Sequence, residues 1–315
     1  MVNIRKCAMI GCGFVGSGSV FSLMESGLFS ELVLIDANRE KAEGEAMDLS
    51  HGVPFARPME IYAGSYDDIA DCGLIIITAG ANQKPNETRL DLVNRNVAIF
   101  KSIIPEIKKR ACEGILLIVS NPVDILTYVA LKLSGFPANR VIGSGTVLDT
   151  ARLKYLLSRH LDVDSRSVHA FIIGEHGDSE LAVWSSANIS GIELQHFCKL
   201  CGCCNQMETM QKLYEDVKNS AYQIIQKKGA TYYGIAMAVR RIAECILRDE
   251  HSILPVSSLI QGHYGLDDLC MGVPTIVGST GVEKVLDITL SGEEQKKLLA
   301  SAEALKSVLG KIDLS

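Results

Sequence analysis

Several features that would define a protein class at once are missing from this sequence of 315 residues. Its apolar runs, such as Ile115 to Val119, are far too short to cross a bilayer. Positive charge is not in excess, because 31 Lys and Arg residues stand against 37 Asp and Glu residues, for a net charge of −6. Internal repeats, low-complexity tracts and Pro/Ser-rich linkers are also absent. We therefore expect no membrane and no nucleic acid among its partners, and no long tether between its domains.

The N-terminal stretch MVNIRKCAMIGCGFVGSG combines basic and apolar residues, as a secretory signal does. Its apolar part is interrupted by Gly11, Gly13 and Gly16, and it contains no small-residue cleavage site, so a strand and a turn fit it better. The ten cysteines are irregularly spaced, which is not the pattern of a disulfide framework. We therefore expect a cytoplasmic protein.

Residues 1–143 alternate between strand and helix patterns. Short apolar runs predict strands at Lys6–Ile10, Glu31–Asp36, Ile61–Ala63, Gly73–Thr78 and Ile115–Ser120. Helices are predicted from the Gly-rich turn to about Glu25 and from Asn38 to Met47, and continuous apolar strands separated by helices indicate a parallel sheet covered on both faces. From about Ser144 the pattern changes to short strands and long amphipathic helices, including Thr231 to about Arg248 and Glu293 to Gly310.

The stretch Gly11-Cys-Gly-Phe-Val-Gly16 follows the first strand and opens the first helix, with Phe14 and Val15 between its last two glycines. The glycines permit a tight turn and a close approach of the backbone to a diphosphate, which the helix N-terminus also favours. Asp36 ends the next strand, where its carboxylate can accept hydrogen bonds from two ribose hydroxyls and would repel a 2′-phosphate. The pattern predicts NAD and not NADP, and the alternative is a Gly-rich turn without a ligand.

Together these patterns predict an α/β fold. We expect a Rossmann-type doubly wound parallel sheet that binds NAD in residues 1–143. A C-terminal α+β substrate domain, residues 144–315, is expected to follow it and to pack against it.

Three stretches carry candidates for chemistry on a carbon that bears oxygen. His176 lies between two glycines in Gly174–Asp178, although a lone histidine is more often structural. Asp149 and Arg152 are three residues apart at a predicted helix start, so both can face one cavity. Asn121 ends a strand of the first domain, where ligands gather in open α/β sheets.

Hydride transfer between NAD and such a carbon needs a small set of groups. His176 suits the general acid/base that handles the proton on oxygen. Asp149 could fix its tautomer and stabilise the imidazolium. Arg152 could hold a substrate carboxylate in bidentate geometry, and Arg89, which ends the polar loop ANQKPNETR, is the candidate for a cation that polarises the carbonyl.

Over essentially its whole length the chain resembles the lactate/malate dehydrogenase family, and within it the bacterial-type L-lactate dehydrogenases. The resemblance is carried by GCGFVGSG, LIDAN, ITAGANQKPNETRLDLVNRN, SNPVDILTYV, VIGSGTVLDTARL, HAFIIGEHGDSE and KKGATYYGIA. It implies the same roles for His176, Asp149, Arg152 and Arg89 as the chemistry does. It also implies a polar contact from Asn121 to substrate and nicotinamide ribose, a cis Asn121–Pro122 bond, and a pocket lined by Thr231 and Ile235.

In the malate dehydrogenases of this family an arginine stands where this chain has Gln83, and it pairs with the second carboxylate of oxaloacetate. Gln83 has no charge, so a second carboxylate would be buried unpaired at a cost on the order of several kcal/mol. The resemblance therefore implies reversible conversion of pyruvate and L-lactate. The alternatives are malate, a bulkier 2-hydroxy acid, or a non-catalytic NAD-binding protein. The same loop departs from the family at Asn86, where glycine is usual.

Two secondary sites are weighed in the same way. Many bacterial relatives are homotetramers activated by fructose 1,6-bisphosphate, through an arginine and a histidine at positions that correspond to Lys154 and His169. Lysine keeps the charge of arginine but cannot form two parallel hydrogen bonds to a phosphate. The alternative to an activator site is a surface lysine and an ordinary histidine.

The cysteines from Cys198 to Cys204 include a C-x-x-C spacing, but no second pair follows it, so we predict reduced thiols and no metal.

Overall fold

The computed structural model describes residues 2–81, 89–202 and 206–314, and at residues 89, 206 and 207 it describes the backbone alone. Gln83 and Asn86 lie outside the described residues, as do Cys203 and Cys204. Arg89 begins a helix, and its side chain is not described. Among the described residues, no helix combines the length and the hydropathy that a membrane crossing requires.

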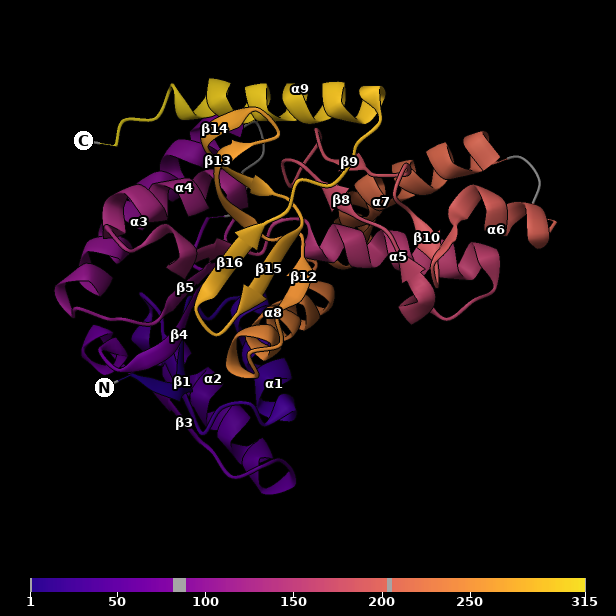
Figure 1. Ribbon diagram of the computed structural model, residues 1–315. Coiled ribbons are helices and arrows are strands. Elements are labelled where there is room, and N and C mark those ends of the chain that lie inside the picture. Colours follow the sequence, from indigo (N-terminus) through magenta and orange to yellow (C-terminus); the bar gives the residue numbers. More distant parts are fainter. Residues whose placement is uncertain (1, 82–88, 203–205, 315) are drawn as a thin grey trace.

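Strands from both halves of the chain form the main sheet (Figure 1). Its eight described strands lie in the order β14-β13-β6-β5-β4-β1-β2-β3. The parallel strands are β1 (Asn3–Ile10), β2 (Glu31–Ile35), β3 (Glu60–Ala63), β4 (Cys72–Ile77), β5 (Ile115–Ile118) and β6 (Val141–Gly143). The predicted parallel sheet is confirmed. The sequence did not indicate that β13 (Ser257–His263) and β14 (Leu266–Gly272) extend it in antiparallel pairing beyond β6.

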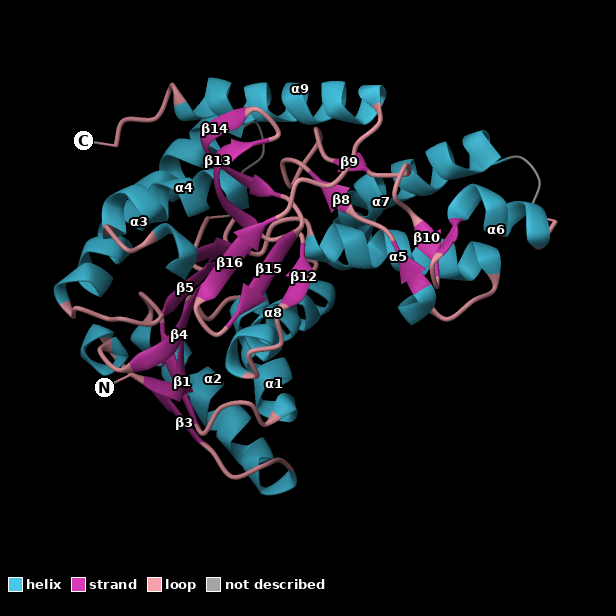
Figure 2. Ribbon diagram, in the orientation of Figure 1, coloured by secondary structure: helices cyan, strands magenta, loops and turns pink. Residues whose placement is uncertain are grey.

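Helices cover both faces of this sheet (Figure 2). On one face lie α1 (Phe14–Ser26), α2 (Arg39–Gly52) and α8 (Tyr233–Leu247). On the other face lie α3 (Arg89–Lys109), α4 (Val123–Ser134) and α9 (Gly292–Leu309). Successive residues of one strand point to opposite faces, so Leu74 and Ile76 enter the first core while Ile75 and Ile77 enter the second. This is why the strands are apolar throughout.

The remaining elements come from the second half of the chain. Its other helices are α5 (Val147–Leu161), α6 (Leu194–Leu200) and α7 (Gln206–Lys228), which lie together on the right of Figure 1. Its short strands are β7 (Val168–His169), β8 (Ile172–Ile173), β9 (Leu181–Ala182), β10 (Asn188–Ile189), β11 (Ile192–Glu193), β12 (Ser252–Leu254), β15 (Thr275–Gly278) and β16 (Gly281–Val285). Single 3-10 turns lie at η1 (Val53–Phe55), η2 (Tyr66–Ile69), η3 (Ala138–Arg140) and η4 (Ser165–Ser167).

Helix starts follow the capping residues of the sequence. The side chain of Asn38 accepts a hydrogen bond from the backbone N–H of Lys41, as the predicted cap requires, and α2 begins at the next residue. This helix continues past the predicted end at Met47, because Leu49 still packs into the core. In α9, Ser291 and Glu294 form a capping box, which fixes the start of the helix.

Candidate active site

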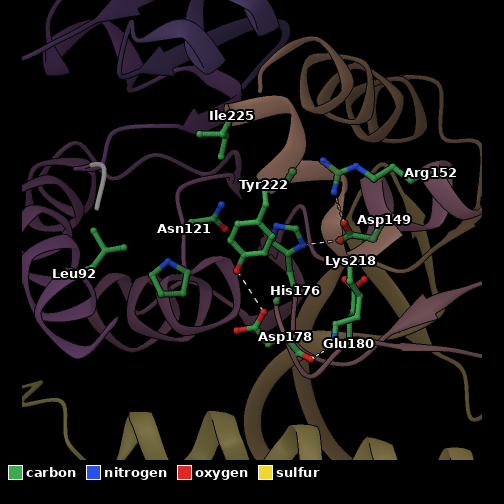
Figure 3. Close-up of a pocket in the computed structure, with 13 residues that line it drawn as sticks. Leu92, Asn121, Asp149, Arg152, His176, Asp178, Glu180, Lys218, Tyr222 and Ile225 are labelled. Carbon is green, nitrogen blue, oxygen red and sulfur yellow. Dashed lines mark hydrogen bonds and ion pairs between the residues drawn. The ribbon is translucent and has the colours of Figure 1, made fainter. Parts of the chain in front are cut away.

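A cavity of about 470 Å³ lies at the carboxyl end of β5, beside α5 and α7 (Figure 3). The carboxyl ends of parallel strands are the usual position of ligands in open α/β sheets. Its lining residues are Leu92 of α3, Asn121 and Pro122 after β5, Asp149 and Arg152 of α5, His176, Gly177, Asp178 and Glu180 between β8 and β9, and Lys218, Ala221, Tyr222 and Ile225 of α7. Four predicted site residues, Asn121, Asp149, Arg152 and His176, thus meet at one cavity.

His176 and Asp149 form a close pair in the wall of this cavity. Nδ1 of His176 lies 2.6 Å from Oδ2 of Asp149, whose side chain is almost fully buried. Burial alone would lower the pKa of His176, but the charge and hydrogen bond of Asp149, together with the charges of Asp124 and Glu180, raise it to about 9. With Nδ1 engaged by the carboxylate, Nε2 is the nitrogen left for a reacting group.

Asp149 is shared between His176 and Arg152, as Figure 3 shows. Nη1 of Arg152 donates to Oδ1 of Asp149 over 2.7 Å, and the arginine side chain is 15% exposed. Burial raises the pKa of Asp149, but the charges of His176 and Arg152 outweigh this and lower it. A guanidinium has five N–H donors, and this contact uses one, so the group can also bind a carboxylate in the cavity.

Asp124, which the sequence reasoning missed, fixes the backbone that carries His176. Its Oδ2 accepts from the backbone N–H of His176 over 2.7 Å, and its Oδ1 accepts from the hydroxyl of Ser257 over 2.6 Å. Burial raises its pKa to about 6 in spite of these hydrogen bonds. Gly174 has a φ of 97° and pairs with Gly272 of β14 through two backbone hydrogen bonds. The histidine is therefore held from α4, β13 and β14 at once.

The turn between β1 and α1 fits a dinucleotide. Gly11 has a φ of 103°, and a Cβ at Gly16 would fall 1.9 Å from the carbonyl oxygen of Gly11. A Cβ at Gly13 would meet no atom of the protein within 4 Å, so packing does not require glycine there, whereas close approach of a diphosphate does. Phe14 and Val15 begin α1, and Phe14 is 72% exposed and stacks on Tyr232.

The carboxylate of Asp36 is held beside the same turn. It accepts hydrogen bonds from the backbone N–H of Cys12 over 2.7 Å and from that of Asn38 over 2.9 Å. A carboxylate has about four lone-pair sites, so this geometry retains capacity for two ribose hydroxyls. The residues present at this turn therefore fit NAD.

The other predicted residues lie after β5, on α5, on β7 and at the start of α8. The Asn121–Pro122 bond is cis, as the resemblance implies. Thr231 precedes α8 and Ile235 lies in its first turn, and neither is among the described residues that line the cavity. Lys154 is half-buried on α5, and burial lowers the pKa of its amine; His169 is exposed on β7, which contacts α5.

Among the described residues, His and carboxylate groups gather closely enough for a metal ion in two places. One group, Asp149, His176 and Glu180, contains the acid/base pair and has a guanidinium beside it. The other, Asp249, His251 and Glu283, is exposed and joined by its own ion pairs. Separately, the described cysteines of the C-x-x-C spacing differ in environment, since Cys198 is buried in the core around α5 and Cys201 is exposed.

Comparison with known proteins decides the family. The model of the NAD binding domain of lactate/malate dehydrogenase matches residues 5–143, and the model of its alpha/beta C-terminal domain matches residues 146–313. The chain belongs to the lactate/malate dehydrogenase family. The resemblance is thus confirmed, and membership makes the chain an NAD-dependent oxidoreductase.

Relatives in the family align along the whole chain. An L-lactate dehydrogenase of Acetivibrio thermocellus is 58% identical over 99% of this chain and 98% of the relative. L-lactate dehydrogenase 1 of Clostridium acetobutylicum is 56% identical over 99% of this chain and 100% of the relative. The crystal structure of the minor L-lactate dehydrogenase of Enterococcus mundtii in its ligands-bound form has a TM-score of 0.96, with 43% identity and 99% of both chains covered. This likeness confirms the predicted fold class.

Proposed function

We propose that this enzyme is an L-lactate dehydrogenase, which transfers a hydride reversibly between NAD and the pyruvate/L-lactate pair. The observation that carries the proposal is the hydrogen-bonded set of Arg152, Asp149 and His176 in the wall of one cavity. The neutral side chain of Gln83 and the names of relatives more than half identical to the chain support the choice of substrate.

In this proposal the protein handles the proton and the substrate. Bound NADH supplies the hydride in reduction, and NAD accepts it in oxidation. Nε2 of His176 donates its proton to the carbonyl oxygen as negative charge develops there, and accepts it back from lactate. Because the pKa of His176 is about 9, the imidazole is protonated at neutral pH and ready for reduction. Asp149 holds the tautomer and stabilises the imidazolium.

Substrate positioning is assigned to the residues around the pair. Arg152 holds the carboxylate of pyruvate through two parallel hydrogen bonds from its guanidinium. The amide of Asn121 contacts the substrate and the nicotinamide ribose. Arg89 polarises the carbonyl, a role that rests on the sequence and the family. Thr231 and Ile235 are assigned to the substrate and nicotinamide ends of the pocket on the same grounds.

Arg152→Lys is expected to raise KM for pyruvate and to lower kcat/KM by roughly 10- to 100-fold, because lysine keeps the charge but loses one charge-assisted hydrogen bond of about 1.5–3 kcal/mol. Arg159→Lys is the matched control, since Arg159 is exposed near the end of the same helix. Steady-state kinetics at saturating NADH measure both variants. An Arg152→Lys enzyme with the parent's KM would contradict the carboxylate assignment.

We also propose that the enzyme is a homotetramer activated by fructose 1,6-bisphosphate through Lys154 and His169. The sugar bisphosphate is expected to lower the half-saturating pyruvate concentration by a factor within the 5- to 150-fold range of allosteric couplings. Lys154→Gln should weaken this response, whereas Lys199→Gln, at an exposed position of α6, should not. Pyruvate saturation curves measure the effect. Superimposable parent curves with and without the effector, at neutral and slightly alkaline pH, would refute activation.

We also propose that the enzyme is cytoplasmic. The described cysteines are free thiols, as is usual in the reducing cytoplasm.

The function itself is tested by oxidation of NADH with a panel of 2-oxo acids, including oxaloacetate and acids bulkier than pyruvate. Preference for oxaloacetate would favour a malate dehydrogenase, and preference for a bulkier acid would favour another 2-hydroxy acid dehydrogenase. Binding of NADH without oxidation by any acid would favour a non-catalytic protein.

A further inference from the structure

Glu180 is a buried acid in the active-site cavity that the proposed chemistry does not use. The residue is 5% exposed, and its Oε1 accepts no hydrogen bond from the described part of the chain. A carboxylate oxygen, a ring nitrogen of His176 and an oxygen of Asp149 all lie within 4.8 Å of one another. Buried polar atoms without a partner are rare and costly, so this one needs an explanation.

Charged and titratable groups face Glu180 and His176 from several elements. They are Asp149 and Arg152 on α5, Asp124 on α4, Lys218, Tyr214 and Tyr222 on α7, and Asp178 between β8 and β9. Tyr214 donates its hydroxyl to the backbone carbonyl of Glu180 and so fixes the main chain there. Burial and the charge of Asp149 raise the pKa of Glu180 to about 8, against the opposing charges of His176, Arg152 and Lys218.

We propose that Glu180 is a positioning residue that acts through His176: once ionised, its carboxylate holds the proton on the imidazole and extends to higher pH the range in which the enzyme reduces pyruvate. The idea rests on the proposed function, since it concerns the proton that His176 gives to the substrate. It adds a second carboxylate to the pair, one that is neutral at neutral pH and charged in alkaline solution.

The sign of the effect follows from the two pKa values. Below about pH 8 Glu180 is protonated and adds no charge beside the imidazolium. Between about pH 8 and 9 the carboxylate forms while the imidazolium is still present, and their attraction opposes loss of the proton from His176. Opposite charges about 4–6 Å apart shift a pKa by roughly 1–3 units, so removing this carboxylate should lower the pKa of His176. The two groups titrate as a coupled pair.

The test is the pH profile of log kcat/KM for pyruvate at saturating NADH. In Glu180→Gln the midpoint of the alkaline limb should move down by about one pH unit, the lower end of that range. Glu175→Gln is the matched control, because Glu175 is also buried in the same segment and accepts a hydrogen bond from Ser179, which also contacts Ser301 of α9. The alkaline limb of the Glu175→Gln profile should have the same midpoint as that of the parent.

An unmoved limb in Glu180→Gln, with kcat/KM lowered equally at every pH, would assign Glu180 a merely structural role and overturn the proposal. Should this variant not fold, nuclear magnetic resonance of the parent labelled with ¹⁵N-histidine answers the question. The His176 signal should then titrate in two steps, near pH 8 and near pH 9, and a single step would overturn the proposal. A parent that does not reduce pyruvate at all would instead refute the proposed function.

Discussion

Gln83→Arg is expected to shift the ratio of kcat/KM for oxaloacetate over pyruvate upward by between about a hundredfold and a few thousandfold. In the proposed assignment Gln83 offers no charge to the second carboxylate of oxaloacetate, and an unpaired buried charge costs about 3–5 kcal/mol. The added guanidinium supplies the partner that malate dehydrogenases of the family have at this position. Steady-state kinetics with both acids at saturating NADH give the ratio.

The described part of the cavity contains one more basic residue and two more acidic residues besides Arg152, Asp149 and His176. The basic residue is Lys218, whose amine donates a hydrogen bond to the backbone carbonyl of Asp178. The acidic residues are Asp178 and Glu180. Gln211→Arg is the control, because it adds the same charge at an exposed position of α7. Equal ratios in Gln83→Arg and the parent would refute the assignment of Gln83.

His176→Asn is expected to lower kcat in both directions by roughly 10²- to 10⁴-fold, the usual contribution of a positioned general acid/base. Affinity for NADH should stay near the parent's, because we assign cofactor binding to the Gly-rich turn and Asp36, which are not part of the pair. His196→Asn is the control, since His196 is exposed on α6. Single-turnover reduction of pyruvate and fluorescence titration with NADH separate the two effects. A kcat within tenfold of the parent's would contradict the proton-transfer role.

The parts of the fold that the sequence predicts are those with local causes. The Gly-rich turn is one, because a Cβ at Gly16 would collide with the carbonyl oxygen of Gly11. The start of α2 is another, since the Asn38 cap acts within three residues. The antiparallel strands β13 and β14 were missed because pairing with β6 is a contact between distant segments. The sequence patterns of β13 and β14 do not indicate which strand each will pair with.

In the candidate site, too, the residues linked by local spacing were predicted and those placed by packing were missed. Asp149 and Arg152 were brought together correctly by helix spacing, and their contact is 2.7 Å. That His176 meets Asp149 was suggested by the chemistry and the family, because no local pattern fixes the distance between two residues 27 positions apart. Asp124 and Glu180 were missed although both lie in stretches that carried the resemblance. Their buried positions come from packing, and an acidic residue in a motif gives no signal of burial.

The central claim, that this enzyme is an L-lactate dehydrogenase and not a malate dehydrogenase, is tested most directly on the unaltered protein. The measurement is the ratio of kcat/KM for pyruvate over oxaloacetate with NADH at neutral pH, together with the configuration of the product formed from pyruvate. We predict a ratio of about a hundred or more, from the cost of an unpaired second carboxylate, and L-lactate as the product. A ratio below one, or D-lactate as the product, would contradict the claim.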